Sequence, residues 1–362
     1  MSGGPIMIMA GGTGGHVFPG LAVAAELKAR QRDVVWLGTR RGLEARLVPQ
    51  HDIDIEWISI AGVRGRGIWA WISAPFRIVA AVVEALRALR RRRPAAVLGM
   101  GGFVAGPGGF AAWLTRRPLI IHEQNSVAGT TNRLLAPFAA RVLEAFPGSF
   151  PKRVRAELVG NPVRRSFTPL EPPRGRLLAR GRLRRRVLVV GGSQGARILN
   201  ETLPKALAEL PVALLPEVWH QAGRGLDATR AGYAAAGVEA RVDEFIDDMS
   251  AAYQWADLVV ARAGALTVAE LAMVGVGAIL VPFKAAIDDH QTLNASYFAN
   301  GGAGVVVREQ ELTAGVLARE LSSCLGDLKR LAAMAEAAHA QAKFAVAEKI
   351  AAACLEAAEV RA

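Results

Sequence analysis

The chain has 362 residues, of which 52% are hydrophobic, 6% are aromatic and 38 are glycine. This length exceeds one ordinary hydrophobic core and predicts two domains. The apolar content excludes a mainly disordered chain and suits an α/β protein with buried strands. The net charge of +12 indicates an anionic partner, which leaves nucleic acid, a nucleotide, a lipid surface and a diphosphate substrate open.

The cysteines indicate the cellular compartment, and the uncharged segments indicate whether the chain spans a membrane. Cys324 and Cys354 lie far apart in an alanine-rich region, and the first residues lack the charged-then-apolar pattern of a secretory signal. We therefore predict a reducing, cytoplasmic compartment. Residues 97–115, within the longest uncharged stretch, are rich in glycine and contain Pro107. They predict a strand and a glycine-rich turn rather than a membrane-spanning helix.

The predicted elements alternate between strands and helices. The N-terminal half has apolar runs typical of strands at residues 6–9, 34–37, 95–98 and 119–121, and a helix at residues 21–30. The C-terminal half has such runs at residues 187–190, 258–260 and 278–281, a helix from about Ala196, and an alanine-rich helical segment at 332–362. This order is typical of parallel sheets.

Domain boundaries follow from the same pattern. Residues 169–186 hold three prolines and seven arginines, which predicts a surface linker. Both halves open on a strand, a glycine loop and a helix start, so they look like architectural duplicates. We predict domains at residues 1–165 and 166–340, with a helix at about 341–362 packing back on the first domain.

The first glycine loop, residues 11–15, lets the backbone approach a ligand, and the helix behind it offers unpaired amides to an anion. Its spacing fits neither the dinucleotide fingerprint nor the P-loop, so redox and ATPase functions are disfavoured. The alternative is a purely structural turn. Pro19 near the first helical turn places His16 just outside the helix N-terminus. There the ring stays neutral and serves as a general base, or merely caps the loop.

Four further motifs follow predicted strands. A second glycine cluster occupies residues 99–109, and the run from His122 to Asn125 ends a strand, where ligand groups gather in parallel sheets or where polar side chains anchor a loop. Residues 191–196 offer amides and a hydroxyl to a diphosphate. Glu270 follows a tight turn at Gly264 and either holds a ribose diol or is a solvated helix residue.

Metal ligands are the remaining question. Asp52 and Asp54 match the Asp-x-Asp of metal-dependent glycosyltransferases, but they alternate with Ile53 and Ile55 as in a half-exposed strand. No His or Cys cluster has zinc spacing. We predict neither a metal nor another cofactor.

Seven strings in chain order resemble the MurG family of GT-B glycosyltransferases, family 28 in the sequence classification. They lie at residues 10–20, 99–103, 122–125, 160–164, 191–196, 245–249 and 264–270. The resemblance covers about residues 6–353. It implies an α/β GT-B fold, with two Rossmann-like domains whose parallel sheets face each other across a cleft. The N-terminal domain would bind a lipid-linked acceptor and the C-terminal domain UDP-N-acetylglucosamine.

The resemblance also implies an activity and its residues. N-acetylglucosamine would pass with inversion from UDP-N-acetylglucosamine to the C4 hydroxyl of the muramyl sugar of lipid I, the undecaprenyl-diphosphate-linked peptidoglycan precursor, to form lipid II. His16 would be the base, with His122 and Glu123 as helpers. The implied donor contacts are Thr13, Gly14, Gly15, Asn125, Arg164, Ser193, Ile246, Ala265, Leu266, Thr267, Val268, Ala269, Glu270 and Gln291. Many members of the family have a histidine where this sequence has Ala285. The resemblance therefore implies no role for the side chain at this position.

The implied location is the cytoplasmic face of the cell inner membrane, as a peripheral enzyme near cell-wall and division proteins. Residues 68–86 are rich in Trp, Phe, Ile and Val and run into the arginines at 90–93. This segment predicts contact with an anionic membrane surface, or else a core helix with a solvated basic end. A UDP-N-acetylglucosamine 2-epimerase would not need it. Binding of nucleic acid is disfavoured, because the arginines lack interleaved aromatic residues.

Overall fold

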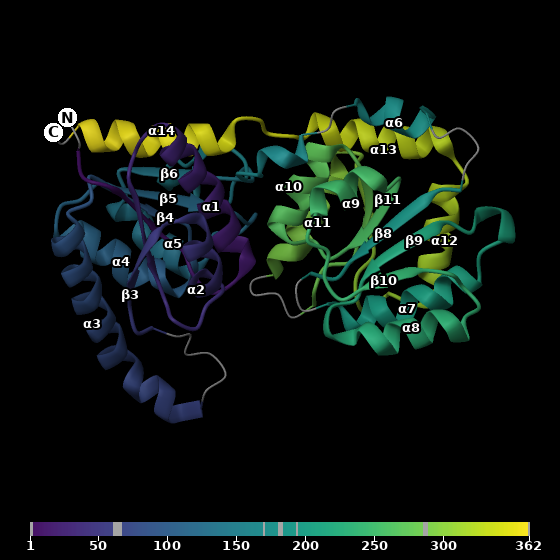
Figure 1. Ribbon diagram of the computed structural model, residues 1–362, viewed down its shortest axis with the longest axis horizontal. Helices are drawn as coiled ribbons and strands as arrows, with labels where there is room; N and C mark the ends of the chain where they lie inside the picture. The colour runs from purple at the N-terminus through teal and green to yellow at the C-terminus, as the bar shows by residue number, and fades with distance from the viewer. Residues whose placement is uncertain are drawn as a thin grey trace. The chain divides into compact units, whose positions relative to one another are not determined.

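The computed structural model describes residues 3–60, 67–168, 171–179, 184–192, 195–284 and 289–360, and only the backbone of residues 67–73. The chain forms two compact units (Figure 1). Unit 1 comprises Met1–Val163 and Ala345–Ala362, and unit 2 comprises Arg164–Phe344. Every strand pair in both units is parallel, so the predicted α/β class is confirmed.

Unit 1 is built on a seven-stranded sheet with the order β3-β2-β1-β4-β5-β6-β7. The strands are β1 (Ile6–Met9), β2 (Val34–Gly38), β3 (Asp54–Trp57), β4 (Ala96–Gly99), β5 (Leu119–Glu123), β6 (Arg141–Glu144) and β7 (Glu157–Leu158). The central strands β1, β4 and β5 are buried along their whole length. Continuous apolar runs suit them because helices cover both faces of a parallel sheet.

The helices of unit 1 divide between those two faces. They are α1 (Gly14–Ala29), α2 (Glu44–Leu47), α3 (Gly67–Arg92), α4 (Gly102–Leu114), α5 (Thr130–Leu135) and α14 (Val346–Glu359), with short 3-10 turns at η1 (Val48–His51), η2 (Ala136–Phe138) and η3 (Lys152–Val154). One core joins the sheet to α1 and α14, and another joins it to α3 and α4. Figure 1 shows α14, coloured yellow, beside the N-terminal elements of the chain.

Helix α4 replaces most of the glycine-rich turn that the sequence predicts at residues 97–115. Its glycines allow close packing on the sheet, since a Cβ at Gly108 would lie 2.2 Å from the sulfur of Met9 and 2.8 Å from Leu37. Composition misled the prediction here: glycine lowers helix propensity in isolation, but tertiary packing outweighs that preference.

Unit 2 repeats the same design. Its six-stranded sheet has the order β10-β9-β8-β11-β12-β13. If β8 is counted as its first strand, this order is 3-2-1-4-5-6, as in the first six strands of unit 1. The strands are β8 (Arg186–Val190), β9 (Glu217–Gln221), β10 (Arg241–Asp243), β11 (Leu258–Ala261), β12 (Gly277–Leu280) and β13 (Gly304–Val306). The helices are α6 (Pro173–Ala179), α7 (Arg197–Ala208), α8 (Leu226–Ala235), α9 (Met249–Trp255), α10 (Ala265–Val274), α11 (His290–Asn300), α12 (Ala314–Leu325) and α13 (Leu328–Ala340), with 3-10 turns η4 (Arg165–Phe167), η5 (Val212–Leu214) and η6 (Gly223–Gly225).

Three predicted boundaries differ from the structure. Helix α1 begins at Gly14 rather than residue 21, because tertiary packing outweighs the low helix propensity of the glycines and Pro19 in its first two turns. The predicted linker contains α6. The predicted helix at 332–362 is two helices, with a break before α14 at Ala345, whose φ of 56° is left-handed. Among the described residues, no helix has the length and apolarity to cross a bilayer.

Candidate active site

The carboxyl ends of β1 and β4 carry the two glycine loops of unit 1. The sheet order reverses between these strands, and ligands bind at such switch points in open α/β sheets. Gly101 and Gly102 have φ values of 91° and 78°, which side-chain-bearing residues rarely adopt. A Cβ at Gly102 would lie 2.5 Å from the carbonyl oxygen of Gly11. Glycine therefore lets the two loops touch.

His16 lies at this junction, in the first turn of α1 rather than just outside it as predicted. Its half-buried ring places Nδ1 3.3 Å from Oγ1 of Thr13, the helix N-cap residue. The opposite edge of the ring lies against the loop after β4. A Cβ at Gly101 would be 3.0 Å from His16 Nε2. Thr13 thus orients the ring through Nδ1 and directs Nε2 toward Gly101.

Glu44 supports the first glycine loop and was not found from the sequence. Its side chain is 0% exposed. Oε2 accepts a hydrogen bond of 3.0 Å from the backbone N–H of Gly12, while Oε1 accepts bonds from the N–H and hydroxyl of Thr39. Gly12 is 32 residues away in the chain, so no local spacing signals this contact.

We expect Glu44→Gln to lower the free energy of unfolding by about 1–3 kcal/mol, because the new amide turns a donor toward one of these buried donors. The displaced glycine loop should also lower turnover. Thermal unfolding and an activity assay test both effects, with exposed Glu359→Gln in the same unit as the control. A variant as stable and active as the control would contradict the role of Glu44.

His122 and Glu123, predicted as catalytic helpers, lie within β5 and are buried. His122 Nε2 lies 2.9 Å from the carbonyl oxygen of Gly160, and Nδ1 lies 3.0 Å from Gln124 Nε2. Burial lowers the pKa of His122 to about 4, so its ring is neutral near pH 7. The ring therefore holds the segment at Gly160 rather than facing solvent.

Glu123 organises the loop that follows β5. Its Oε1 accepts from the backbone N–H and the side-chain amide of Asn125, and its Oε2 accepts from Gly129 N–H and Asn132 Nδ2. All four donors lie within 3.2 Å. This carboxylate fixes the position of Asn125, which the sequence predicts to contact the sugar donor.

The predicted donor motif of unit 2 lies at the equivalent switch point, between β8 and β11. Glu270 is in the second turn of α10, half-buried, and hydrogen-bonded to the buried Tyr253. Burial raises the pKa of Glu270 to about 7, although the Arg164 guanidinium and the Tyr253 hydroxyl act in the opposite direction. A carboxyl held this close to its ionisation point responds strongly to any ligand that donates hydrogen bonds.

The turn before α10 is held in place from several sides. Asn294 Nδ2 donates to the carbonyl oxygen of Ala263, and the Arg262 guanidinium contacts Glu309 at 2.9 Å. Gln291, a predicted donor contact, accepts a hydrogen bond from Phe283 N–H through Oε1. The side chain of Ile246 is buried. The bonds of Asn294 and Arg262 hold the loop between β11 and α10 in place.

The other predicted contacts fall in three places. Gly14 and Gly15 supply the first two amides of α1, which have no carbonyl one helical turn earlier. Leu266, Thr267, Val268 and Ala269 occupy the start of α10 after Ala265. Ser193 lies outside the described residues, between Gly192 and Gly195, both of which have positive φ.

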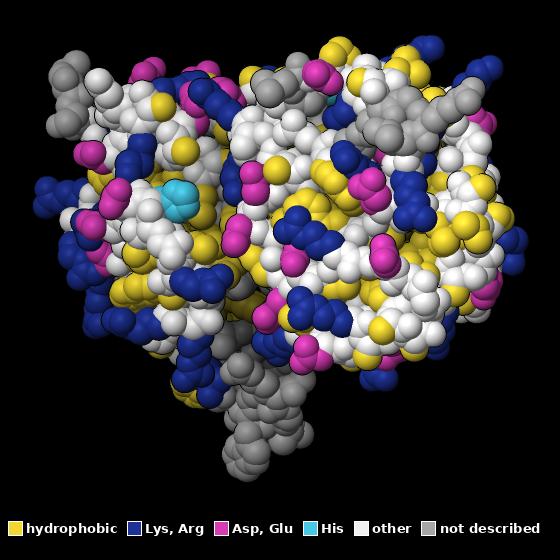
Figure 2. Space-filling model, turned by 45° about the vertical axis from the view of Figure 1, so that its right-hand side comes forward, with side chains coloured by type: hydrophobic (Ala, Val, Ile, Leu, Met, Phe, Trp, Pro, Cys, Tyr) yellow, Lys and Arg dark blue, Asp and Glu magenta, His cyan; other side chains and the backbone are white. Residues whose placement is uncertain are grey.

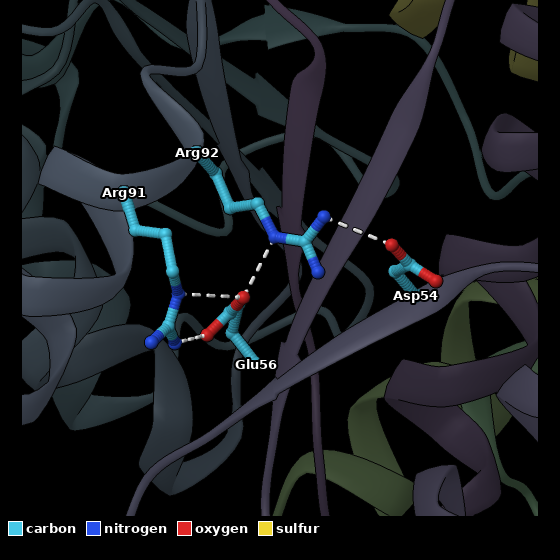
Figure 3. Close-up of polar contacts among 4 residues, drawn as sticks. All are labelled: Asp54, Glu56, Arg91 and Arg92. Carbon is cyan, nitrogen blue, oxygen red and sulfur yellow. Dashed lines mark hydrogen bonds and ion pairs between the residues drawn. The ribbon is translucent and has the colours of Figure 1, made fainter.

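Asp54 of the Asp-x-Asp pair is engaged in an ion pair. Asp54 begins β3 and forms an ion pair of 2.9 Å with Arg92, while Glu56 on the same strand pairs with Arg91 and Arg92 (Figure 3). Together these four side chains fix the C-terminal end of α3 to β3. Within the described ranges, no group of three or more His, Cys, Asp or Glu residues is arranged to hold a metal ion.

Two doubly wound parallel sheets in one chain, each with a glycine-rich loop at its switch point, are the architecture of GT-B glycosyltransferases. The glycosyltransferase family 28 N-terminal domain matches residues 6–144, and the family 28 C-terminal domain matches residues 186–350. The chain therefore belongs to glycosyltransferase family 28.

Full-length relatives agree with this assignment. The chain is 57% identical over 352 residues to the UDP-N-acetylglucosamine–N-acetylmuramyl-(pentapeptide) pyrophosphoryl-undecaprenol N-acetylglucosamine transferase of Nitrosococcus oceani, covering 97% of this chain and 98% of that enzyme. The transferase of the same name from Alkalilimnicola ehrlichii is 55% identical over 353 residues, with the same coverage. The crystal structure of Acinetobacter baumannii MurG is 40% identical and superposes with a TM-score of 0.85, covering 98% of this chain and 99% of that one.

Proposed function

We propose that this chain transfers N-acetylglucosamine from UDP-N-acetylglucosamine to the C4 hydroxyl of the muramyl sugar of lipid I, which forms lipid II. The supporting observation is its identity of 52–57% over almost its full length with relatives that carry this activity in their names. The reaction is a single displacement in which the acceptor oxygen attacks the anomeric carbon, the bond to UDP breaks, and a base takes the hydroxyl proton.

The residues divide between the two units in this proposal. His16 Nε2 takes the proton, and Thr13 holds the ring. Glu270 accepts hydrogen bonds from the ribose diol, the backbone of Ile246 meets the uracil, and the amides at the start of α1 and α10 stabilise the departing diphosphate. His122 and Glu123 act as positioning residues, because both are buried and occupied by protein partners.

The direct test supplies labelled UDP-N-acetylglucosamine with a short-chain lipid I analogue. We expect the lipid-linked disaccharide and free UDP as products. Conversion of the donor to its 2-epimer without an acceptor, or no turnover at all, would contradict the proposal.

Turnover should not require a metal ion, since the unpaired amides at a helix N-terminus, such as those of Gly14 and Gly15, can stabilise a diphosphate in place of a metal. We expect the rate in excess EDTA to equal the rate in added magnesium. Loss of activity in EDTA that magnesium restores would return the acidic pairs at Asp52 and Asp54 or at Asp288 and Asp289 to consideration. Asp288 lies outside the described residues.

We also propose that unit 1 contacts the membrane peripherally through α3, α4 and α5. Exposed apolar side chains gather on these helices and on η2, and the Trp113 ring packs at a tilt against Phe110 and Phe138, with centroids 5.4 and 4.9 Å away. Phe76 on α3 is 79% exposed. Helix α3 packs against α4, and α4 against α5, so these side chains belong to neighbouring elements. Trp69 and Trp71 lie among the residues whose side chains are not described.

The arginines beside this surface differ in their surroundings. Arg91 and Arg92 form ion pairs with Glu56 and Asp54, whereas Arg77, Arg87 and Arg90 are exposed. Replacing the whole run at 90–93 would therefore disturb the fold as well as any membrane contact. On the face in Figure 2, Lys and Arg are interspersed with Asp and Glu, so the net charge alone does not locate the contact.

We expect Arg77→Gln/Arg87→Gln/Arg90→Gln to weaken binding to vesicles containing anionic lipid by about tenfold or more, because each arginine near such a surface contributes roughly 1 kcal/mol. High salt should release the wild type. Co-sedimentation measures both, and Arg224→Gln/Arg308→Gln/Arg319→Gln on unit 2 is the charge-matched control. Equal binding of the two triple variants would contradict an electrostatic contact at α3.

A further inference from the structure

Gln124 has a buried hydrogen-bond acceptor without a partner among the described residues. The residue follows β5 directly, and its side chain is 2% exposed. Its Oε1 contacts no donor in the described structure. A buried acceptor left unpaired costs free energy, and such groups call for an explanation, which a ligand supplies at a functional site.

The surrounding bonds determine which end of the amide is the oxygen. His122 Nε2 faces the carbonyl of Gly160, an acceptor, so Nε2 carries the proton and the neutral ring accepts at Nδ1. Gln124 Nε2 donates to Nδ1 at 3.0 Å and to the carbonyl of His122 at 3.2 Å. A flipped amide would set its oxygen against two acceptors. The oxygen of Gln124 is therefore the atom turned away from His122.

That oxygen points to the same place as the proposed base. A Cβ at Gly101 would lie 3.0 Å from His16 Nε2 and 3.6 Å from Gln124 Oε1. Both atoms therefore lie within 4 Å of one position, beside Gly101 at the carboxyl ends of β1, β4 and β5. A ligand that gives a proton to His16 therefore brings a neighbouring group to Gln124.

We propose that Gln124 Oε1 accepts a hydrogen bond from the C6 hydroxyl of the acceptor muramyl sugar and so positions its C4 hydroxyl at His16. This inference rests on the proposed function. In a muramyl sugar linked through C1, the C3 oxygen is an ether and C4 bears the attacking hydroxyl. The C6 hydroxyl is then the one other sugar hydroxyl, and it is attached next to C4 through C5. Gln124 is a substrate-positioning residue in this scheme, with no part in proton transfer.

The experiment compares a short-chain lipid I analogue with its 6-deoxy counterpart in the wild type and in Gln124→Met. We expect the 6-deoxy acceptor to lower the wild-type kcat/KM for the acceptor by about five- to tenfold, which is the usual effect of one lost hydrogen bond. Gln124→Met should lose at least that factor with the full acceptor and little more with the 6-deoxy one. The donor KM should stay unchanged, and Gln50→Met, an exposed glutamine of unit 1, should behave as wild type.

The outcomes separate this inference from the proposed function. If the wild type uses neither acceptor, the proposed function fails. If it uses both equally well, a buried water or nothing satisfies Oε1 and the role of Gln124 is overturned, whether or not Gln124→Met folds. A 6-deoxy penalty that persists in full in Gln124→Met would also overturn it. Gln124→Glu, which in its protonated form keeps an acceptor and one donor to His122, should restore part of the sensitivity to the C6 hydroxyl.

Discussion

His16→Ala is expected to lower kcat by about 10²–10⁴-fold with modest changes in both KM values, because a positioned general base contributes a factor of that size. The structure sets the ring at the switch point of unit 1, with Nδ1 near the Thr13 hydroxyl and Nε2 beside Gly101. Single-turnover measurements with saturating donor and acceptor isolate the chemical step from product release.

Two variants sharpen that result. Thr13→Val keeps the imidazole and removes the hydroxyl that orients it, so we expect a smaller loss of kcat than in His16→Ala. His51→Ala removes an exposed histidine of the same unit and should leave kcat unchanged. A kcat for His16→Ala within a factor of about three of wild type would exclude His16 as the base. The buried His122 would not be its replacement, because both of its ring nitrogens are already engaged.

The elements that the sequence predicts well are those with local causes. Strand β1 and residues 187–190 of β8 are uninterrupted apolar runs, each followed within two residues by a glycine loop, and both patterns depend only on neighbours in the chain. The same local pattern identified the glycine loops and the turn at Gly264, and parallel topology then placed them at the carboxyl ends of the strands. Helix α4 was missed because its glycines serve contacts with Met9 and Leu37, which are distant in sequence.

The residues that hold the candidate site together were mostly beyond sequence reasoning. Glu44 acts on Gly12 across 32 residues, and His122 acts on Gly160 across 38. No periodicity records such pairs, since each depends on how two segments distant in sequence meet after the sheet has formed. Sequence could name His122 and Glu123 as polar residues at a strand end, but the difference between a group that meets substrate and one that holds a loop appears only in burial and bonding.

Glu270 should govern both donor affinity and its pH dependence. Because its pKa in the ligand-free protein is about 7, binding of a ribose diol that donates to the carboxylate should strengthen as pH rises through that value. We expect Glu270→Ala to raise the donor KM by about 10- to 150-fold, which corresponds to the loss of about 1.5–3 kcal/mol from a charge-assisted hydrogen bond. Glu270→Gln should weaken donor binding and remove its pH dependence near 7. Titration with UDP at pH 6 and pH 8 provides the measurement.

The thermal stability of Glu270→Gln is an independent check on Glu270, because this variant should gain stability while it loses donor affinity. The folded-state pKa of Glu270 lies above the ordinary value of 4.5, so ionising this carboxyl costs the folded state free energy as pH rises from about 4.5 to 7. Glu270→Gln should therefore unfold at a higher temperature than wild type at pH 8 while binding the donor less tightly. Exposed Glu311→Gln should change neither property. An unchanged donor KM would remove Glu270 from the site, whereas a loss of stability at pH 8 would mean that its bond to Tyr253 outweighs the cost of burying its charge.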